Sequence, residues 1–187
     1  SLKNLRPYLD GTKHGKVVGI TFDDGYKNNL INAAPVLKKY NFSATCYIVS
    51  ESIGSSNSWD LDKKITQRPL MTKREIFKWL NLGMDIGAHT KTHADLTSIS
   101  DEKVLEEIKE CKTNLEEIFK VPIYDFCYPF GKFNDLSFNI VKNAGYLSAT
   151  SMIRGKVNAN SSIFKLPRIP INHRTLPHLF LTKILTK

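Results

Sequence analysis

The stretch Thr21-Phe22-Asp23-Asp24-Gly25 places two adjacent carboxylates directly after an apolar run and directly before a turn residue. The apolar run, with Val17, Val18, Ile20 and Phe22, predicts a buried β-strand over 16–22, and Gly25 predicts the turn that ends it. Neighbouring carboxylates push one pKa upward unless a cation or a proton lies between them. The pair therefore indicates a metal ligand, a general base, or one of each, whereas a plain Asp-Gly turn is the structural alternative.

A second polar motif, His89-Thr90-Lys91-Thr92-His93, follows the apolar run 84–88 and holds two of the five histidines of the chain. Two histidines four residues apart converge on one ion if the backbone between them makes a helical turn. A carboxylate would be the third ligand, and the remaining coordination positions would be open, as in catalytic sites. The histidine pair alone also occurs in surface loops. Together with Asp23 and Asp24 at another strand end, it predicts a site beyond the carboxyl ends of the strands.

Apolar periodicity and turn residues predict alternating strands and helices along the whole chain. The expected strands are 16–22, 43–49, 84–88, 123–128, 147–151 and 164–170. The expected helices are 28–40, 72–81, 100–119, 134–144 and 175–185. This alternation predicts an α/β protein with parallel strands and outer helices, arranged either as an open sheet or as a small barrel.

Three further patterns predict local features. Thr72-Lys73-Arg74-Glu75 is a capping-box sequence at a helix start. In the helix expected over 100–119, the Glu and Lys residues opposite the apolar face predict a solvated surface. The stretch 52–71 contains Trp59 and lacks periodicity, and such long irregular segments are usually functional or mobile.

With 187 residues, 41% of them hydrophobic, the chain predicts one domain over residues 1–187 with a single core. No apolar run approaches the ~20 residues that cross a bilayer. Because the chain starts with Ser1 and not with Met, we expect a processed or N-terminally truncated product. The three cysteines do not indicate a compartment, and we expect Cys46 and Cys127 to be buried.

Together with Tyr128-Pro129-Phe130-Gly131, the Asp-Asp and His-His motifs resemble the first three motifs of the polysaccharide deacetylase family of carbohydrate esterases, in the family's order. The resemblance covers the chain from about Val17 to Ile171, and the third motif is similar to that of a bacterial branch with Tyr-Pro-Tyr/Phe-Gly. It implies a distorted (β/α) barrel with fewer than eight strands. It also implies a metal-dependent carbohydrate N-deacetylase, which removes N-acetyl groups from an amino-sugar glycan or a lipid-linked glycan precursor, in the cell envelope, the periplasm or outside the cell.

The resemblance also implies roles for individual residues. Asp24, His89 and His93 would hold one divalent metal ion, zinc in most relatives, with other divalent transition metals as alternatives. Asp23 would be the general base that takes a proton from the attacking water. The backbone N–H of Phe130 would stabilise the tetrahedral oxyanion.

Two departures from the family pattern affect the expected mechanism. The third-motif Arg that pairs with the base is replaced here by Cys127, and Arg168 is our candidate to take its place. No Asp or Glu follows Asp135, so neither His173 nor His178 has a nearby carboxylate in the sequence to orient it. We therefore expect neither histidine to be the proton donor, although a Leu-x-His pattern at His178 superficially matches the family.

The formal net charge of +9 is the remaining global feature. No nucleic-acid recognition module accompanies it, so we expect no nucleic-acid partner. An N-acetylated saccharide that is anionic or lipid-linked, or contact with an acidic membrane face, would explain the charge, as would solubility alone. Two alternative functions stay open: a catalytically weak or inactive saccharide-binding relative, and an amidase that acts on a small non-sugar amide.

Overall fold

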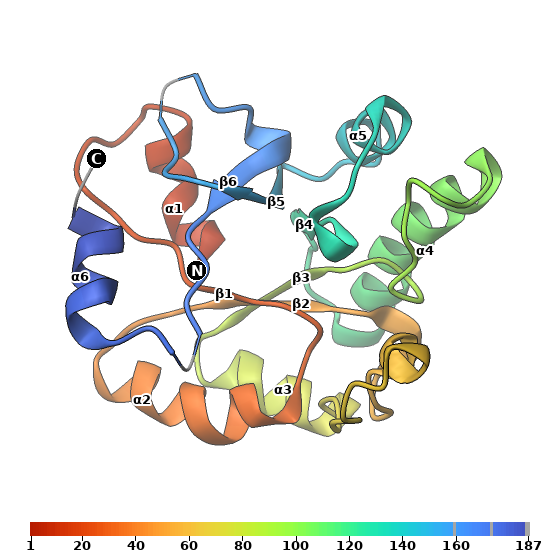
Figure 1. Cartoon of the computed structure of the whole chain (residues 1–187), viewed down its shortest axis with the longest axis horizontal. Helices are drawn as coiled ribbons and strands as arrows, with labels where there is room; N and C mark the ends of the chain where they lie inside the picture. The colour runs from red at the N-terminus through yellow and green to blue at the C-terminus, as the bar shows by residue number, and fades with distance from the viewer. Residues whose placement is uncertain (159, 173, 186–187) are drawn as a thin grey trace.

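Six parallel strands form one curled sheet in the order β1-β2-β3-β4-β5-β6, so each strand pairs with the next along the chain. The computed structural model describes residues 1–158, 160–172 and 174–185. The strands are β1 (Thr21–Phe22), β2 (Thr45–Ile48), β3 (Asp85–Ala88), β4 (Asp125–Cys127), β5 (Ser148–Arg154) and β6 (Leu166–Arg168). Together with outer helices they make a single-domain half-barrel (Figure 1), which confirms the predicted distorted (β/α) barrel with fewer than eight strands.

In the described part of the chain, six α-helices accompany the strands, and five of them fall where the sequence predicts helices. They are α1 (Leu2–Leu9), α2 (Ala34–Lys39), α3 (Lys73–Asn81), α4 (Asp101–Phe119), α5 (Asp135–Asn143) and α6 (Pro177–Leu185). Short helical turns are η1 (Asn29–Ala33), η2 (Ser50–Ser52), η3 (Ser58–Lys63), η4 (Pro129–Gly131) and η5 (Ile163–Lys165). The predicted capping box is confirmed, because Glu75 N–H donates to Thr72 Oγ1 and Thr72 N–H donates to Glu75 Oε2. Within the described residues, no helix combines the length and the apolar character that crossing a membrane requires.

The first predicted strand is wrong at its start. Val17 and Val18 are exposed, with fractional exposures of 41% and 63%, and regular pairing begins only at Thr21. Because β1 lies at one edge of the open sheet, residues before Thr21 lack a strand partner on one side. An apolar sequence therefore leads into the sheet without being buried by it.

The interior of the half-barrel is filled from its amino end by α1. Its Leu2 packs on Tyr47 and Cys127, which are both fully buried, and Arg6 pairs with Asp125 at 3.2 Å. A Cβ atom at Gly87 would come within 2.6 Å of both Tyr47 and the backbone of β4, so only glycine allows this close packing. The expected burial of Cys46 and Cys127 is confirmed.

Parallel pairing brings the carboxyl ends of β1, β3 and β4 to one edge of the sheet. Asp23 and Asp24 follow β1 directly, His89 follows β3, and Tyr128-Pro129-Phe130-Gly131 follows β4. The fold therefore gathers the three sequence motifs at one end of the half-barrel, as expected for a ligand site in a parallel sheet.

Candidate active site

Three side chains from the first two motifs converge at the carboxyl edge of the sheet. The Nε2 atoms of His89 and His93 each lie 3.3 Å from Asp24 Oδ1, and the donor atoms of all three residues lie within 4.8 Å of one another. Both histidines are buried, with exposures of 2% and 6%. One carboxylate and two imidazoles with this arrangement can hold a divalent ion and leave coordination positions open.

The histidines converge because the backbone around them is left-handed. The helical turn that the His-x-x-x-His spacing suggests is not what brings them together. Asp24, Thr90 and His93 have φ values of 70°, 63° and 65°. Residues without glycine's freedom adopt this conformation at a cost of about 1–2 kcal/mol each. The Thr90 side chain stabilises the turn, because its Oγ1 accepts a hydrogen bond of 3.0 Å from His93 N–H.

The orientation of His89 is fixed by the backbone of β4. Its Nδ1 lies 2.7 Å from the carbonyl oxygen of Cys127, so Nδ1 carries the proton and donates it to that carbonyl. While Nε2 also carries a proton, it donates to Asp24; once Nε2 loses that proton, its lone pair faces Asp24 and is available to a cation. A backbone partner on the distal nitrogen is typical of metal-ligating histidines, and the residues present therefore fit a bound cation.

The pKa shifts show a carboxylate held in its charged form between the two rings. Burial alone would raise the pKa of Asp24, but hydrogen bonds from His89 and His93 outweigh it and hold that pKa far below its usual range. Burial lowers the pKa of His93, more than the Asp24 hydrogen bond raises it. For His89, burial is outweighed by Cys127 and Asp24, and its pKa is raised.

Asp23 lies beside this cluster, with its donor atom within 4.8 Å of one on His89, and it pairs with Arg168. The guanidinium binds the carboxylate in two places, with Nη1 2.6 Å from Oδ1 and Nη2 2.8 Å from Oδ2. Arg168 is itself held by Ser151, whose carbonyl oxygen accepts from Nε at 2.9 Å. Burial alone would raise the pKa of Asp23, but the Arg168 hydrogen bonds and charge lower it below its ordinary value.

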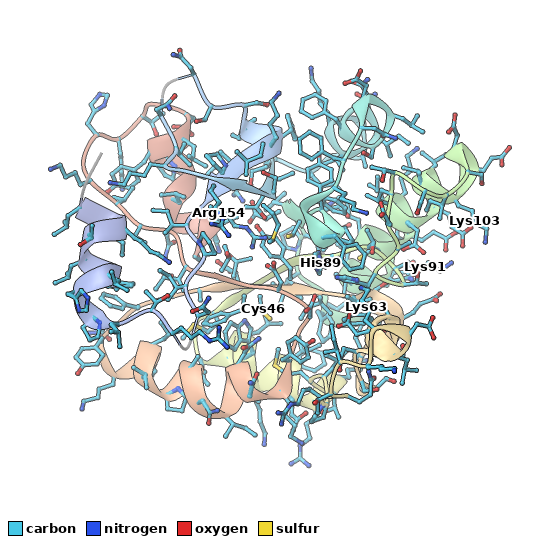
Figure 2. All side chains as sticks on the ribbon, viewed as in Figure 1. Cys46, Lys63, His89, Lys91, Lys103 and Arg154 are labelled. Carbon is cyan, nitrogen blue, oxygen red and sulfur yellow. The ribbon has the colours of Figure 1, made fainter. Side chains whose placement is uncertain are left out.

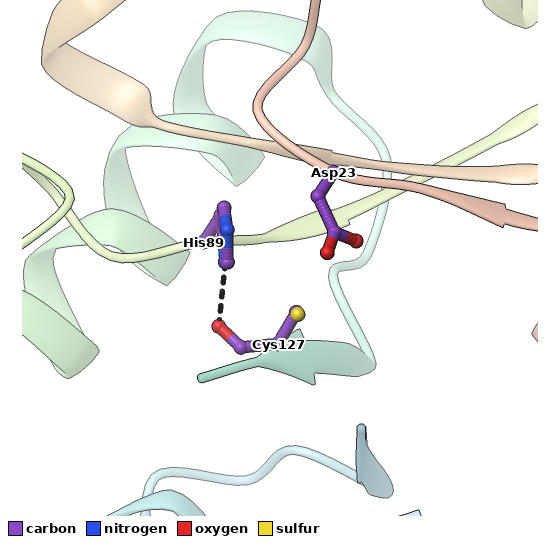
Figure 3. Close-up of side chains that lie close together, drawn as sticks. All are labelled: Asp23, His89 and Cys127. Carbon is purple, nitrogen blue, oxygen red and sulfur yellow. Dashed lines mark hydrogen bonds between the residues drawn. The ribbon is translucent and has the colours of Figure 1, made fainter. Parts of the chain in front are cut away.

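Cys127 completes a second group of potential ligands, with Asp23 and His89, whose donor atoms also lie within 4.8 Å of one another (Figure 3). Two contacts make this group the weaker candidate for a metal. Both oxygens of Asp23 are taken by Arg168, and Nη2 of Arg168 lies 3.3 Å from Cys127 Sγ. The carboxylate that remains available to a cation is therefore that of Asp24.

Aromatic rings from the third motif and from the irregular segment 52–71 surround His93. The indole of Trp59 on η3 stacks on the imidazole, with ring centroids 4.4 Å apart, and Phe130 meets it edge-on at 4.6 Å. Lys63, also on η3, places its ammonium 4.2 Å from the centre of the Phe130 ring. Phe130 has a φ of 57° and is 39% exposed, so it forms part of an open rim beside the cluster.

Sequence reasoning missed Glu107 on α4, which lies among the charges that we expected on a solvated face. Its carboxylate is buried and accepts hydrogen bonds from Lys91 N–H at 2.8 Å, Thr92 N–H at 2.9 Å and Thr92 Oγ1 at 2.6 Å. Glu107 therefore clamps the loop between the two histidines. Its position three residues after Val104 and directly before Ile108 places it at the apolar stripe of the helix, and this signal could have identified it.

Two other expected or overlooked residues have clear positions. Tyr26, two residues after Asp24, interacts with that carboxylate through its hydroxyl, and burial together with the Asp24 charge raises the tyrosine pKa. His178 lies on α6, on the side of the molecule opposite the carboxyl ends of β1 and β3 (Figure 1). His173 lies outside the described residues.

Comparisons with known proteins agree on one family. Residues 10–149 match the family model described as polysaccharide deacetylase. The chain is 28% identical over 188 residues to the poly-β-1,6-N-acetyl-D-glucosamine N-deacetylase of Staphylococcus aureus; the match covers 94% of this chain and 62% of that protein. The chain therefore spans less than two thirds of the length of this curated relative.

Solved structures show the same fold. The polysaccharide deacetylase from Bacillus cereus superposes with a TM-score of 0.81 at 28% identity, over 98% of this chain and 55% of that one. The deacetylase PplD of Streptococcus pyogenes, solved in complex with acetate, superposes with a TM-score of 0.84 at 24% identity, over 98% and 78% of the two chains.

We expect His93→Ala to weaken the binding of Zn²⁺ by more than about tenfold, because it removes one of three converging donors. Isothermal titration calorimetry of the full chain measures this, and circular dichroism should show an unchanged fold. His178→Ala is the matched control and should bind zinc as the parent does. Tight, stoichiometric binding by a His89→Ala/His93→Ala double variant would refute the ligand set.

We expect Glu107→Gln to weaken zinc binding by about 10–100-fold, the usual effect of losing a partner that orients metal ligands. The amide nitrogen would face the N–H groups of Lys91 and Thr92, and the histidine loop would lose its clamp. The same calorimetric titration tests this, with the exposed Glu117→Gln on the same helix as control. Unchanged affinity in Glu107→Gln would show that the loop holds its conformation unaided.

Proposed function

Because this chain belongs to the polysaccharide deacetylase family, we propose that it is a metal-dependent hydrolase that removes N-acetyl groups from an amino-sugar glycan. One observation carries the proposal: Asp24, His89 and His93 converge, while both oxygens of the adjacent Asp23 bind Arg168. The two neighbouring carboxylates therefore have different surroundings, and different surroundings allow one to bind a cation and the other to accept a proton.

The choice of substrate follows from the relatives and from the rim of the site. The Staphylococcus aureus relative is named for a polymer of N-acetylglucosamine, which supports an N-acetylated glycan or its lipid-linked precursor as substrate here. Trp59 and Phe130 beside His93 provide apolar ring surface of the kind on which a sugar face packs. Lys63 adds a positive charge at this rim and would favour an anionic saccharide.

Asp24, His89 and His93 would hold the divalent ion, for which zinc is our first candidate, because two imidazoles and one carboxylate suit zinc. When bound, the ion would supply Lewis-acid polarisation of the acetamide carbonyl and would lower the pKa of a water molecule in the site. His89 is held in the correct tautomer by the Cys127 carbonyl, and Glu107 holds the loop that carries His93.

In the proposed reaction, Asp23 accepts a proton from the water whose oxygen forms a bond to the acetamide carbon. Arg168 keeps this carboxylate ionised and turned toward the site, because it binds both oxygens and lowers the pKa of Asp23. The backbone N–H of Phe130 would donate to the oxyanion that forms. The C–N bond then breaks as the departing nitrogen takes a proton from solvent, Asp23 gives up the proton that it accepted, and acetate and a protonated amino sugar are released.

Arg168 also bears on the alternative of an inactive saccharide-binding relative. Cys127 in place of the family's arginine is the main reason for that alternative. Arg168 on β6 supplies a guanidinium that binds both oxygens of Asp23. The positive charge and the two-point contact that an arginine at position 127 would give to Asp23 are therefore provided by Arg168. A small non-sugar amide as substrate uses the same chemistry, and substrate comparison distinguishes it.

We expect the zinc-loaded chain to release acetate from N-acetylated β-1,6-glucosamine oligomers or from chito-oligosaccharides, as measured by an enzymatic acetate assay. Asp23→Asn should lower kcat by about 10²–10⁴-fold while zinc binding persists, since an amide cannot accept the proton. Asp101→Asn, at the exposed start of α4, is the control. Full activity of Asp23→Asn, or acetate release from a small amide but from no saccharide, would contradict the proposal.

We expect an unusually high ratio of ester to amide hydrolysis, because α6 places His178 far from the site and an amine leaving group needs a proton donor. An activated acetyl ester should turn over readily, and His173→Ala and His178→Ala should leave the ratio unchanged. Parallel rates on 4-nitrophenyl acetate and on an acetylated oligosaccharide measure it. A selective loss of amide hydrolysis in either variant would identify that histidine as the donor.

A further inference from the structure

The charges of this chain are strongly segregated along the sequence. Residues 11–22, 25–50 and 136–187 contain no Asp or Glu, so all 18 acidic residues lie elsewhere. The same three segments contain nearly half of the 27 basic residues: Lys13, Lys16, Lys27, Lys38, Lys39, Lys142, Arg154, Lys156, Lys165, Arg168, Arg174, Lys183 and Lys187. The net charge of +9 is therefore a property of part of the molecule and not of its whole surface.

Three pieces of these segments lie on one side of the molecule, and we call them the basic face: residues 11–18, 38–42 and 169–185 without 173. The first two lead into β1 and β2, so they lie at the amino edge of the sheet, and α6 lies on the same side in Figure 1. Val18 and Phe42 each lie three residues before the paired residues Thr21 and Thr45. In Figure 2, His89, Lys63 and Lys91 mark the opposite side, where the candidate active site lies.

The basic face exposes large apolar side chains between its cations. Val18, Tyr40, Phe42, Leu181 and Leu185 have exposures of 54% to 72%, and α6 buries none of its described residues. The cations Lys13, Lys16, Lys38, Lys39, Arg174 and Lys183 are all exposed as well. The nearest acidic residue along the chain is Asp10, whose carboxylate accepts hydrogen bonds from Thr12.

This combination distinguishes between the partners that a basic surface can have. A polyanion such as nucleic acid would be bound by the cations alone and would leave the apolar side chains in water. A second copy of the chain would bring like charges together, because this face has no carboxylate to complement its lysines. An anionic bilayer satisfies both features, since acidic headgroups attract Lys and Arg while apolar side chains enter the boundary below them.

We propose that the basic face is a docking surface for an anionic lipid bilayer, with α6 and the turn at Tyr40 and Phe42 lying in the headgroup region. Docking through the amino edge of the sheet leaves the carboxyl edge, with Asp24 and the histidines, facing away from the lipid. The proposal does not depend on the catalytic one, because no residue of the basic face lies in the candidate active site.

Sedimentation of the full chain with vesicles tests this. We expect binding to vesicles of phosphatidylcholine with 30% phosphatidylglycerol, weakening as salt rises, and little binding to phosphatidylcholine alone. Lys38→Gln/Lys39→Gln should lower the partition coefficient about tenfold or more, and Phe180→Ser/Leu181→Ser should lower it to a similar extent. Lys103→Gln/Lys109→Gln on α4 is the matched control and should bind as the parent does.

Circular dichroism and acetate release should be unchanged in all three variants, which separates loss of docking from loss of folding or of catalysis. Three results would overturn the proposal. They are no binding to anionic vesicles, equal loss of binding in the α4 control, and binding to heparin without binding to vesicles. Concentration-dependent dimerisation that Phe180→Ser/Leu181→Ser abolishes would assign the face to a second copy of the chain instead.

Discussion

The ion pair between Arg168 and Asp23 joins the two ends of the sheet and separates the roles of two adjacent carboxylates. β1 and β6 are the edge strands of an open half-barrel, and the guanidinium reaches from one to the other across its interior. Without a cation beside it, burial and the charge of Asp24 would raise the pKa of Asp23. With Arg168 bound to both oxygens, Asp23 stays ionised beside His89, and Asp24 is the carboxylate that contacts both histidines.

The site also requires left-handed backbone conformations at residues other than glycine, and the intrinsic preferences of these residues disfavour them. Asp24, Thr90 and His93 adopt left-handed conformations, and each costs free energy that other contacts must offset. Glu107 supplies such contacts with three hydrogen bonds to the loop, at distances of 2.6 to 2.9 Å. A buried carboxylate on a helix that otherwise packs against the sheet thus positions the histidine loop, although it does not itself contact Asp24.

The two edges of the sheet have different surface chemistry. The carboxyl edge gathers the carboxylates, imidazoles and aromatic rings of the candidate active site, while the basic face presents cations and apolar side chains, and Asp85 and Asp125 at the starts of β3 and β4 lie outside that face. In a parallel sheet, loops after the strands and loops before them lie at opposite ends. The two ends can therefore carry different chemistry, one for a saccharide and one for a surface.

The helices, the strands and the motifs could be predicted from the amino-acid sequence, because strand and helix periodicity and helix capping are local properties. The predictable features include the alternation of parallel strands and helices, the capping box at Thr72, and the position of Asp23, Asp24, His89 and His93 at strand ends.

The sequence did not show which residues from distant parts of the chain lie next to one another in the folded protein. The exposure of Val17 and Val18 follows from the position of β1 at a sheet edge, and the burial of Glu107 from the loop that packs on α4. The environments of Asp23 and Asp24 differ because Arg168, 145 residues away, binds only one of them. Only tertiary packing brings such distant charges together, and a charge on a carboxylate is stabilised by what lies beside it in space and not by its neighbours in the chain.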